Sequence, residues 1–422
     1  MSSAKDPIKV SLIPGSSNEK SSGTPAHWKD AKGSLFQNPW PSYRDLAFMD
    51  AIGYSYKFFL SMPKIPSDVT TRIPSVRPTW GTTTSSGGPD NADKIKATWL
   101  GHACFLVELP VRQSTESPAP SRGARILFDP VFSDRCSPVQ WFGPKRYTQL
   151  PCEIAEIPEV DAIVISHNHY DHLDADTIRA FSKRPNPPHL LAPLGNGEIL
   201  RSLGVSNERI HCLDWWEGRR VEVEVGSSSS SKDGDKSKSA TATVAFDVTC
   251  TPSQHQSARS IHDRFRTLWG SWVVQEVLPQ SDSKSISTES DAKSQQEGMK
   301  VYFAGDTGYR TVQKGEDEDE VPFCPAFKEI GERWGSFDLA LIPIGAYEPR
   351  EFMSRFHCAP QDSVRIFKDI RAKKALGMHW GTWLLTMEDV TEPPRKLAEE
   401  CKKLDIPDED FGVCDLGETV FF

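Results

Sequence analysis

Several features typical of membrane-spanning, secreted or nucleic-acid-binding proteins are missing from this sequence. It has no run of about 18 apolar residues, which a bilayer-spanning helix needs, and no apolar signal-peptide core near its start. Its formal net charge of -9 disfavours the basic surface that non-specific nucleic-acid binding requires. Its nine cysteines are scattered without paired spacing. We therefore expect an intracellular protein with free thiols and no nucleic-acid partner.

Shifts in composition divide the chain into three parts. Residues 1–34 are rich in Ser, Lys and Gly, and we expect a disordered tail. Residues 35–93 hold an aromatic-rich segment, Leu35–Pro66, and a Ser/Gly-rich linker. Residues 94–422 form the expected catalytic domain, interrupted by low-complexity inserts near 226–240, 279–298 and 313–320. Long surface loops are tolerated at little entropic cost, so we expect these inserts to be solvated loops.

The aromatic-rich segment contains one helical pattern. A helix from about Asp45 would place apolar side chains at 3.6-residue spacing on one stripe, namely Phe48, Ile52, Tyr56 and Phe59. This stripe could pack on the core of the protein or face a membrane or partner. The sequence leaves both alternatives open.

From residue 94 onward, short apolar runs such as "VDAIVIS", "MKVYFAGDTG" and "KALGMHWGTW" predict strands. Helical patterns lie between some of them, over Asp174–Lys183, about Pro325–Trp334, Gln361–Ala372 and Glu392–Lys403. Asp174 is a suitable N-cap for the first of these helices. Strand-rich halves with interleaved helices predict two sheets covered by helices, an α+β sandwich.

Histidine is scarce, with 11 among 422 residues, yet three histidines fall within "HNHYDH" at residues 167–172. This run follows the predicted strand "VDAIVIS", so its side chains should stand at a strand end. In an extended segment His167 and His169 point to the same side. Asp171 and His172 can turn toward a second point as the chain bends into the next helix. Two neighbouring metal ions would explain all four residues.

Further candidate ligands follow other predicted strands: His255 in "DVTCTPSQH", Asp306 in "VYFAGDTG" and His379 in "ALGMHWGT". Each residue alone is ambiguous, and a single histidine after a strand more often belongs to the core or to a loop, but together with the histidine run they indicate one site. A His and Asp set without thiolates suits two Zn²⁺ ions, and Mn or Fe less well. Zinc lowers the pKa of bound water to about 7, which supplies a nucleophile at neutral pH.

The order of these motifs resembles the metallo-β-lactamase fold, a four-layer αβ/βα sandwich with a dinuclear site. The resemblance implies one metal held by His167, His169 and His255, and a second held by Asp171, His172 and His379, with Asp306 bridging them. Iron-preferring relatives of this fold carry an acid where His169 stands, so the resemblance favours zinc.

Longer motifs, among them "NPWPS", "LGHACFLVE", "DPVFSDRCSPVQWFGPKRY", "FAGDTGY", "IPIGAYEPR" and "HWGTW", resemble the N-acyl-phosphatidylethanolamine-hydrolysing phospholipase D family over most of Leu35–Phe422. This resemblance implies hydrolysis of N-acyl-phosphatidylethanolamine to an N-acylethanolamine and phosphatidic acid by a peripheral protein at a phospholipid membrane surface. Asp171, Asp306 and His357 are then the expected catalytic residues.

Four residues outside the expected ligand set are candidates near this site. His357 matches a histidine that the family places beside the metals, where it could protonate the leaving group or hold a phosphate oxygen; a surface histidine flanking a helix is the alternative. Tyr170 should point away from the metals toward a substrate channel. Asp129 is expected to orient a ligand histidine. His102 has a similar role by resemblance, with a buried structural histidine as the alternative.

Competing functions remain open at this stage. The same fold could serve a lactonase, a thioesterase or a cyclic-nucleotide phosphodiesterase with a small soluble substrate. A third hypothesis is that the metals only stabilise the fold, although structural zinc sites usually hold one ion with four protein ligands. The protein could also form a homodimer, which the sequence does not decide.

Overall fold

The strands of the protein form two sheets. The computed structural model describes residues 6–14, 23–45, 62–82, 91–112, 119–227, 241–260, 262–279 and 297–422. One sheet has eight strands in the order β1–β8–β9–β10–β11–β12–β13–β14. Their bounds are β1 (Ile8–Leu12), β8 (Gly218–Gly226), β9 (Thr241–Thr251), β10 (Ser271–Val277), β11 (Lys300–Phe303), β12 (Leu339–Pro343), β13 (Ala375–Met378) and β14 (Phe411–Gly412).

The other sheet has seven strands in the order β15–β2–β3–β4–β5–β6–β7. Their bounds are β15 (Thr419–Phe421), β2 (Lys96–Gly101), β3 (Cys104–Glu108), β4 (Arg125–Phe128), β5 (Ala162–Val164), β6 (His189–Pro193) and β7 (Ile210–Leu213). The α-helices are α2 (Val69–Arg72), α3 (Ala175–Ser182), α4 (Gly197–Ser202), α5 (Ala326–Trp334), α6 (Arg350–Met353), α7 (Pro360–Asp369) and α8 (Glu392–Lys403), and two 3₁₀ turns are η3 (Ile154–Glu156) and η4 (Asn207–Arg209).

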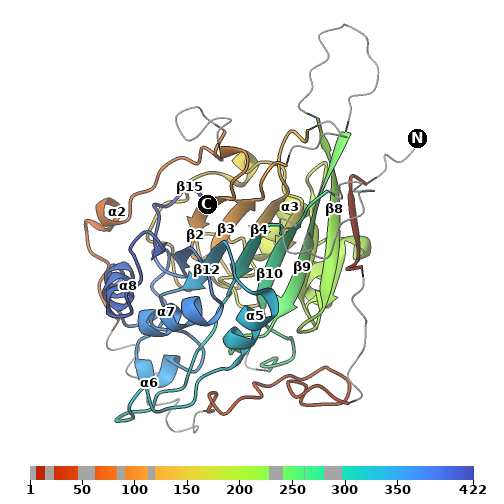
Figure 1. Cartoon of the computed structure of the whole chain (residues 1–422). Helices are drawn as coiled ribbons and strands as arrows, with labels where there is room; N and C mark the ends of the chain where they lie inside the picture. The colour runs from red at the N-terminus through yellow and green to blue at the C-terminus, as the bar shows by residue number, and fades with distance from the viewer. Residues whose placement is uncertain are drawn as a thin grey trace, which may run out of the picture.

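The two sheets pack face to face, with helices on their outer sides. Side chains alternate along a strand, so Phe128 of β4 faces the other sheet, where its ring stacks on Phe303 of β11 with centroids 4.6 Å apart. Its neighbour Leu127 instead packs in a second cluster with Phe181 of α3. Helices α5, α6, α7 and α8 gather on the side of β12 (Figure 1). This arrangement confirms the predicted α+β sandwich.

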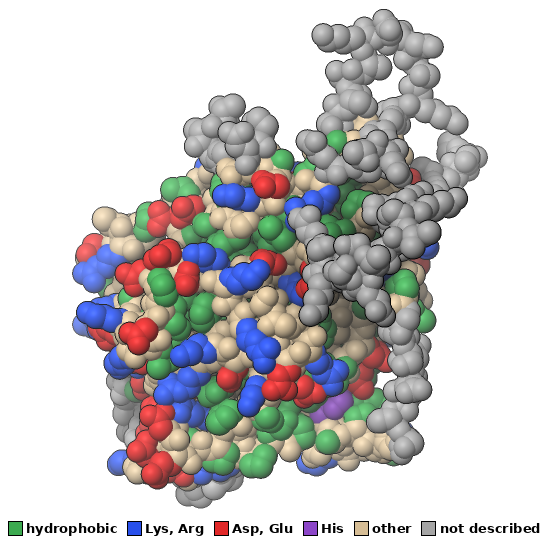
Figure 2. All heavy atoms as spheres, viewed as in Figure 1, with side chains coloured by type: hydrophobic (Ala, Val, Ile, Leu, Met, Phe, Trp, Pro, Cys, Tyr) green, Lys and Arg blue, Asp and Glu red, His purple; other side chains and the backbone are tan. Residues whose placement is uncertain are grey.

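The predicted helices are present within a few residues of their expected bounds. Asp174 is the N-cap of α3, where its side chain accepts a hydrogen bond from the backbone N–H of Asp176. No helix among the described residues is long and apolar enough to cross a membrane. Positive and negative side chains are interspersed over the described part of the face shown in Figure 2.

The expectation of a disordered tail over residues 1–34 is wrong for much of that range. Ile8–Leu12 forms β1, which pairs antiparallel with β8. Farther along, Trp28 Nε1 donates a hydrogen bond to Asp214 Oδ2 at 3.0 Å, and His27 stacks on Trp215. The Ser- and Lys-rich composition concealed this order, because a short edge strand needs only a few alternating apolar residues.

Some expectations fall on residues that the structure does not describe. The helix predicted from about Asp45 lies outside the described residues, because residues 46–61 are not among them. Most of the inserts near 226–240 and 279–298 lie outside as well. The insert at 313–320 is described, and several of its acidic side chains form ion pairs with arginines rather than standing free in solvent.

Strand direction explains why the functional motifs meet. Strands β11, β12 and β13 run parallel, and β9 runs in the same direction because β10 is antiparallel to both β9 and β11. Strands β4 and β5 are parallel in the other sheet. The segments that follow β4, β5, β9, β11 and β13 can therefore gather at one end of the sandwich.

Candidate metal centre

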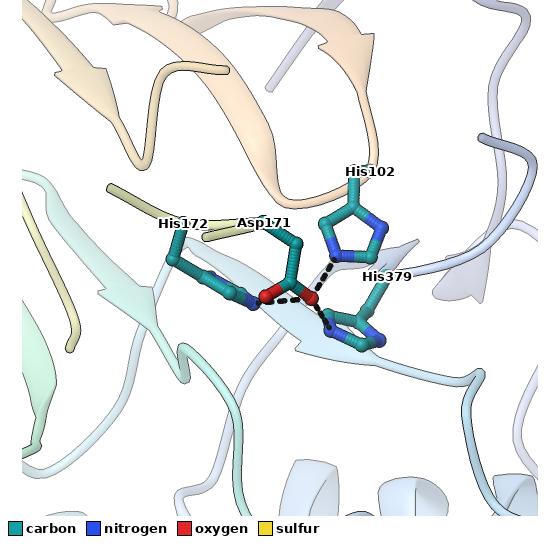
Figure 3. A group of neighbouring side chains, drawn as sticks. All are labelled: His102, Asp171, His172 and His379. Carbon is teal, nitrogen blue, oxygen red and sulfur yellow. Dashed lines mark hydrogen bonds and ion pairs between the residues drawn. The ribbon is translucent and has the colours of Figure 1, made fainter. Parts of the chain in front are cut away.

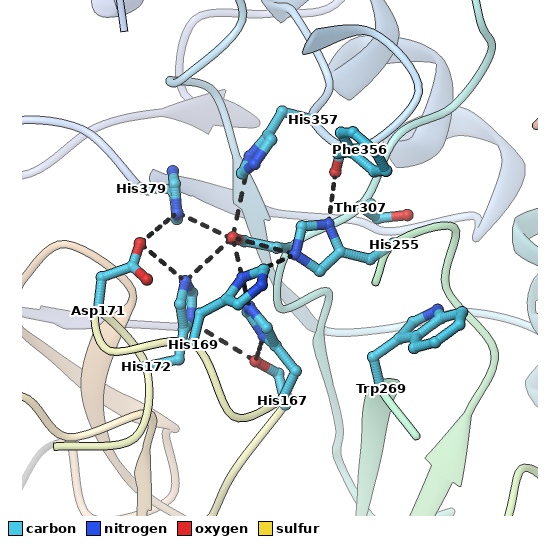
Figure 4. A network of polar contacts seen from close by, with 12 residues as sticks. His167, His169, Asp171, His172, His255, Trp269, Thr307, Phe356, His357 and His379 are labelled. Atoms are coloured by element: carbon cyan, nitrogen blue, oxygen red, sulfur yellow. Dashed lines mark hydrogen bonds and ion pairs between the residues drawn. The ribbon is translucent and has the colours of Figure 1, made fainter. Parts of the chain in front are cut away.

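The structure brings all seven predicted metal ligands together at that end of the sandwich. Figure 4 labels all of them except Asp306. One group consists of His167, His169, His255 and Asp306, whose ligand atoms all lie within 4.8 Å of one another. His169 Nδ1 is 2.8 Å from His167 Nε2 and 3.3 Å from His255 Nε2. Imidazole nitrogens of the three residues that the resemblance assigns to the first metal thus lie close together.

The second group consists of Asp171, His172 and His379, together with His102 (Figure 3). Asp171 Oδ2 lies 3.6 Å from His172 Nε2 and 3.5 Å from His379 Nε2. It is also 3.0 Å from His102 Nε2. His102 thus contacts the carboxylate of a predicted ligand, as expected of a residue that orients Asp171.

Asp306 lies between the two groups. Its Oδ1 is 3.0 Å from His379 Nε2, and its Oδ2 is 3.1 Å from His172 Nε2. The same Oδ2 is 3.8 Å from the Nε2 atoms of both His167 and His255. One carboxylate therefore reaches imidazoles from both groups, which is the position required of a bridging ligand.

Buried polar atoms without a hydrogen bond indicate that these residues fit divalent cations. Both carboxylate oxygens of Asp306 and the Nε2 atoms of His172 and His379 are buried, and they form no hydrogen bond of good geometry with one another or with any other described residue, although Oδ1 lies 3.0 Å from His379 and Oδ2 3.1 Å from His172. Buried polar atoms are normally paired, because an unpaired one costs about 1–3 kcal/mol. A cation between them would satisfy these atoms together, and their nitrogen and oxygen chemistry suits zinc.

The electrostatics of the centre also match a cation. Burial lowers the pKa of His167 and His255 well below the ordinary value, so both imidazoles are neutral and can offer a lone pair. Burial opposes ionisation of Asp306, but the imidazoles of His172 and His379 hold its pKa well below the usual range. The centre therefore combines two neutral imidazoles with an ionised carboxylate. Although burial opposes it, the Asp306 carboxylate raises the pKa of His379 to about 9 and that of His172 well above the ordinary value, so a cation would take the place of the protons on these two imidazoles.

A set of hydrogen bonds behind the candidate ligands fixes their orientation. Asp129 is fully buried, and its Oδ2 lies 2.6 Å from His172 Nδ1. Its Oδ1 accepts a hydrogen bond from the backbone N–H of Ser166 at 2.7 Å. His255 Nδ1 lies 2.9 Å from the carbonyl oxygen of Phe356. With Nδ1 protonated in these contacts, the Nε2 lone pairs of His172 and His255 face the centre.

Backbone geometry around the centre is restricted. His102, Asp129 and His379 have positive φ angles of 54°, 36° and 63°. Such conformations are unfavourable for residues with a Cβ, and they cluster at functional sites. Gly305 has φ +58°, and a Cβ at that position would lie 2.5 Å from the Cβ of Ser166. Gly305 therefore allows the loop that carries Asp306 to approach the loop of residues 166–172, which we call the histidine loop, closely.

Comparisons with known proteins agree with this geometry. Residues 124–380 match the family model of the beta-lactamase superfamily domain. N-acyl-phosphatidylethanolamine-hydrolyzing phospholipase D 1 of Caenorhabditis elegans is 32% identical over 394 residues, which cover 92% of each chain. This chain belongs to the N-acyl-phosphatidylethanolamine-hydrolysing phospholipase D family. It is a metal-dependent hydrolase with the metallo-β-lactamase fold, which confirms the resemblance inferred from its motifs.

A yeast relative is matched over a smaller share of its own length. The mitochondrial N-acyl-phosphatidylethanolamine-hydrolyzing phospholipase D of Saccharomyces cerevisiae is 32% identical over 302 residues, which are 71% of this chain and 50% of the yeast protein. Among solved structures, isothiocyanate hydrolase from Delia radicum gut bacteria has a TM-score of 0.47 and 17% identity, covering 78% of this chain and 99% of that one.

In this phospholipase D family member, His357 lies beside the candidate ligands. Its Nδ1 is buried, makes no hydrogen bond to any described residue, and lies 3.8 Å from Asp306 Oδ2. Burial lowers the pKa of His357 to about 4, which favours the neutral imidazole. A neutral imidazole still carries one N–H donor. The surroundings differ from those of a surface histidine.

Tyr170 contacts a residue that sequence analysis missed. The guanidinium carbon of Arg259 lies 3.9 Å from the centre of the Tyr170 ring. Arg259 Nη1 donates hydrogen bonds to the carbonyl oxygens of Asn168 and Leu173, each at 2.9 Å, and so braces the histidine loop. No sequence pattern marks Arg259. A substrate-binding role for Tyr170 stays a prediction.

Asp129→Asn is expected to lower kcat/KM about 10–100-fold, the usual effect of removing a partner of a metal ligand. The amide would offer one oxygen where the carboxylate now accepts from both Ser166 and His172. Steady-state kinetics with metal analysis would measure the effect. Asp134→Asn, at an exposed carboxylate of the same loop, is the matched control. Equal activity of both variants would contradict the orienting role.

Proposed function

We propose that this protein is a zinc-dependent phosphodiesterase of the phospholipase D type, which hydrolyses N-acyl-phosphatidylethanolamine to an N-acylethanolamine and phosphatidic acid at a membrane surface. The observation that carries the proposal is the pair of His and Asp groups joined by Asp306, in a chain that aligns with the Caenorhabditis elegans enzyme over 92% of both lengths. Five imidazoles and two carboxylates, with no thiolate, favour zinc over manganese or iron.

The charges of the centre suit a phosphodiester substrate. Bound zinc lowers the pKa of a water molecule to about 7 and neutralises charge that builds up on phosphoryl oxygens. Asp171 and Asp306 contribute two negative charges against the four positive charges of two divalent cations. The centre would therefore keep a net attraction for the single negative charge of a phosphodiester, an attraction that an uncharged ester would lack.

His357 is the residue that we propose to contact the reacting phosphate directly. Its Nδ1 lies 3.8 Å from Asp306 Oδ2 and makes no hydrogen bond to any described residue. Its ring lies beside the candidate ligands His255 and His379, with ring centroids 5.1 and 5.2 Å away (Figure 4). From this position it could hold a phosphoryl oxygen or protonate the leaving ethanolamide oxygen. Such a donor contributes roughly 10²–10⁴-fold to a rate.

An exposed aromatic pair supports approach to a membrane. Trp141 and Phe142 are 81% and 68% exposed. Their loop is joined to the centre, because the next residues lead to Arg146, whose guanidinium packs over Trp383 at 4.5 Å, and Trp383 in turn contacts His102. Amphipathic aromatic rings favour the lipid–water interface. We therefore propose an intracellular protein bound peripherally to phospholipid, with this pair entering the interface.

Replacing both rings, in Trp141→Ser/Phe142→Ser, is expected to weaken liposome binding at least tenfold. Burial of one such ring contributes about 1.5–3 kcal/mol, and about 1.4 kcal/mol corresponds to tenfold. Flotation with phospholipid vesicles would measure the loss. Phe323→Ser removes another exposed ring, 51% accessible, and is the control. Unchanged flotation of the double variant would remove this pair from the membrane-binding surface.

Product analysis tests the proposed reaction. The purified protein, loaded with zinc, is given vesicles of mixed phospholipids that contain N-acyl-phosphatidylethanolamine, and His169→Ala serves as the inactive control. We expect N-acylethanolamine and phosphatidic acid from the wild type only. Release of choline or free ethanolamine would overturn the substrate assignment. Faster turnover of a soluble lactone, thioester or cyclic nucleotide would instead favour a soluble-substrate hydrolase of the same fold.

A further inference from the structure

The segment Asn38–Arg44 crosses the loops that carry the candidate ligands, although it lies far from them in sequence. Asn38 binds both backbone polar groups of His255. Its Nδ2 donates to the carbonyl oxygen of His255 at 2.7 Å, and its Oδ1 accepts from the backbone N–H of His255 at 3.2 Å. One side chain thus fixes the backbone of one candidate ligand in two directions.

Ser42 makes the second attachment of this segment. The residue is buried, and its hydroxyl donates to Gln254 Oε1 at 2.6 Å, next to His255. Its carbonyl oxygen accepts hydrogen bonds from the backbone N–H and the hydroxyl of Thr311, at 2.9 and 2.7 Å. Thr311 lies on the loop that follows Asp306. Ser42 therefore ties the His255 loop to the Asp306 loop.

Arg44 makes the third attachment, to the insert at residues 313–320, which we call the acidic loop. Its guanidinium forms a two-point ion pair with Glu316, with contacts of 2.7 and 2.6 Å. The same guanidinium donates to the carbonyl oxygen of Thr311 at 2.6 Å. The carbonyl oxygen of Arg44 accepts from Arg355, whose neighbour Phe356 holds His255 Nδ1. Glu316 is thus connected through Arg44 to the surroundings of His255.

We propose that Asn38–Arg44 is a clasp that slows metal loss, with Asn38 as a positioning residue for the His255 imidazole and the Arg44–Glu316 ion pair as its latch. Residues that fix a metal ligand typically contribute about 10–100-fold to metal affinity. The clasp acts on the metal centre of the proposed function and therefore rests on it. It gives the acidic loop a role that composition alone did not suggest.

Metal release from the full-length zinc protein, without any lipid, tests the clasp. Asn38→Ala should accelerate transfer of zinc to a chromophoric chelator about 10–100-fold, and in the cobalt-substituted protein it should shift the visible absorption of the metal. Gln37→Ala is the matched control, because this neighbouring side chain is exposed and bonds only the carbonyl oxygen of Ala26 among the interactions described for it. A lower unfolding temperature of the metal-free protein with unchanged release would overturn the proposal.

The latch provides an independent test should Asn38→Ala not fold. Glu316 is surface-accessible, so Glu316→Gln should fold and should release zinc severalfold faster at low salt. High salt should remove the difference, because it screens the ion pair in the wild type. Glu320→Gln in the same loop, at an exposed carboxylate, should behave as the wild type. Release by Glu316→Gln at the wild-type rate at low salt would refute the latch.

The test of the clasp can be distinguished from the test of the proposed reaction. Faster release by Asn38→Ala in a protein that fails to cleave N-acyl-phosphatidylethanolamine would support the clasp and reject only the proposed reaction. A wild-type protein that binds no zinc or cobalt would remove the centre itself and the clasp with it.

Discussion

Asp306→Asn is expected to reduce hydrolysis at least about 10³-fold, equivalent to about 4 kcal/mol of transition-state stabilisation. Asp306 approaches imidazoles of both groups: its Oδ2 lies 3.1 Å from His172 Nε2 and 3.8 Å from the Nε2 atoms of His167 and His255. Asparagine keeps the size of the side chain but removes its charge and one of its two acceptor oxygens. The effect should therefore exceed the roughly 10–100-fold expected for residues that only orient a ligand.

Metal content and fold must be measured with activity. We expect Asp306→Asn to hold less than the wild-type amount of metal, while its circular dichroism stays native, because the amide fits the same space. Asp317→Asn, in the acidic loop and exposed, is the control for loss of a carboxylate elsewhere. A variant with a full complement of metal and activity within tenfold of the wild type would show that Asp306 does not bridge.

The candidate ligands could be predicted from sequence because each follows a strand that is itself recognisable. The run from His167 to His172 comes after β5, Asp306 after β11 and His379 after β13. Strands β11 and β13 run in the same direction in one sheet, so residues at their carboxyl ends lie at the same edge whatever the intervening length. Strand β5 belongs to the other sheet, and the packing of the two sheets brings its end to the same place. Sequence order and strand pattern indicated one site, and the resemblance to the metallo-β-lactamase fold implied which residues share a metal.

Other parts of the site left no local signal. Asn38 meets His255 across 217 positions of sequence, and Arg259 braces the histidine loop from 86 and 91 positions away. Hydrogen bonds between a side chain and a backbone group far away in the sequence impose no periodic pattern on the amino-acid sequence. The motif "NPWPS" pointed to the family but not to the role of Asn38. Strand β1 was missed for a related reason, since its pairing with β8 is decided by the partner strand.

Metal removal is expected to lower the thermal unfolding midpoint by several degrees. A ligand that binds only the folded state stabilises it by about 4.1 kcal/mol at 1,000 times its dissociation constant. For domains of 150–250 residues, each kcal/mol corresponds to roughly 2–4 °C, and less in larger chains. In this protein the ions would compensate the charge of Asp306, which is 2% exposed and whose two oxygens form no hydrogen bond of good geometry within the described residues. Calorimetry before and after chelation would measure the change.

The direction and reversibility of the change in unfolding midpoint distinguish a catalytic metal centre from a purely structural one. Zinc added back should restore the midpoint and the activity together, whereas magnesium, which prefers six oxygen ligands, should restore neither. His169→Ala should remain folded at ordinary temperature, because its imidazole is half-buried and the sandwich keeps its core without it. Loss of activity with retained fold in this variant supports catalysis by the metal centre. Unfolding of His169→Ala, or of the chelated wild type, at ordinary temperature would mean that the metals chiefly hold the fold together.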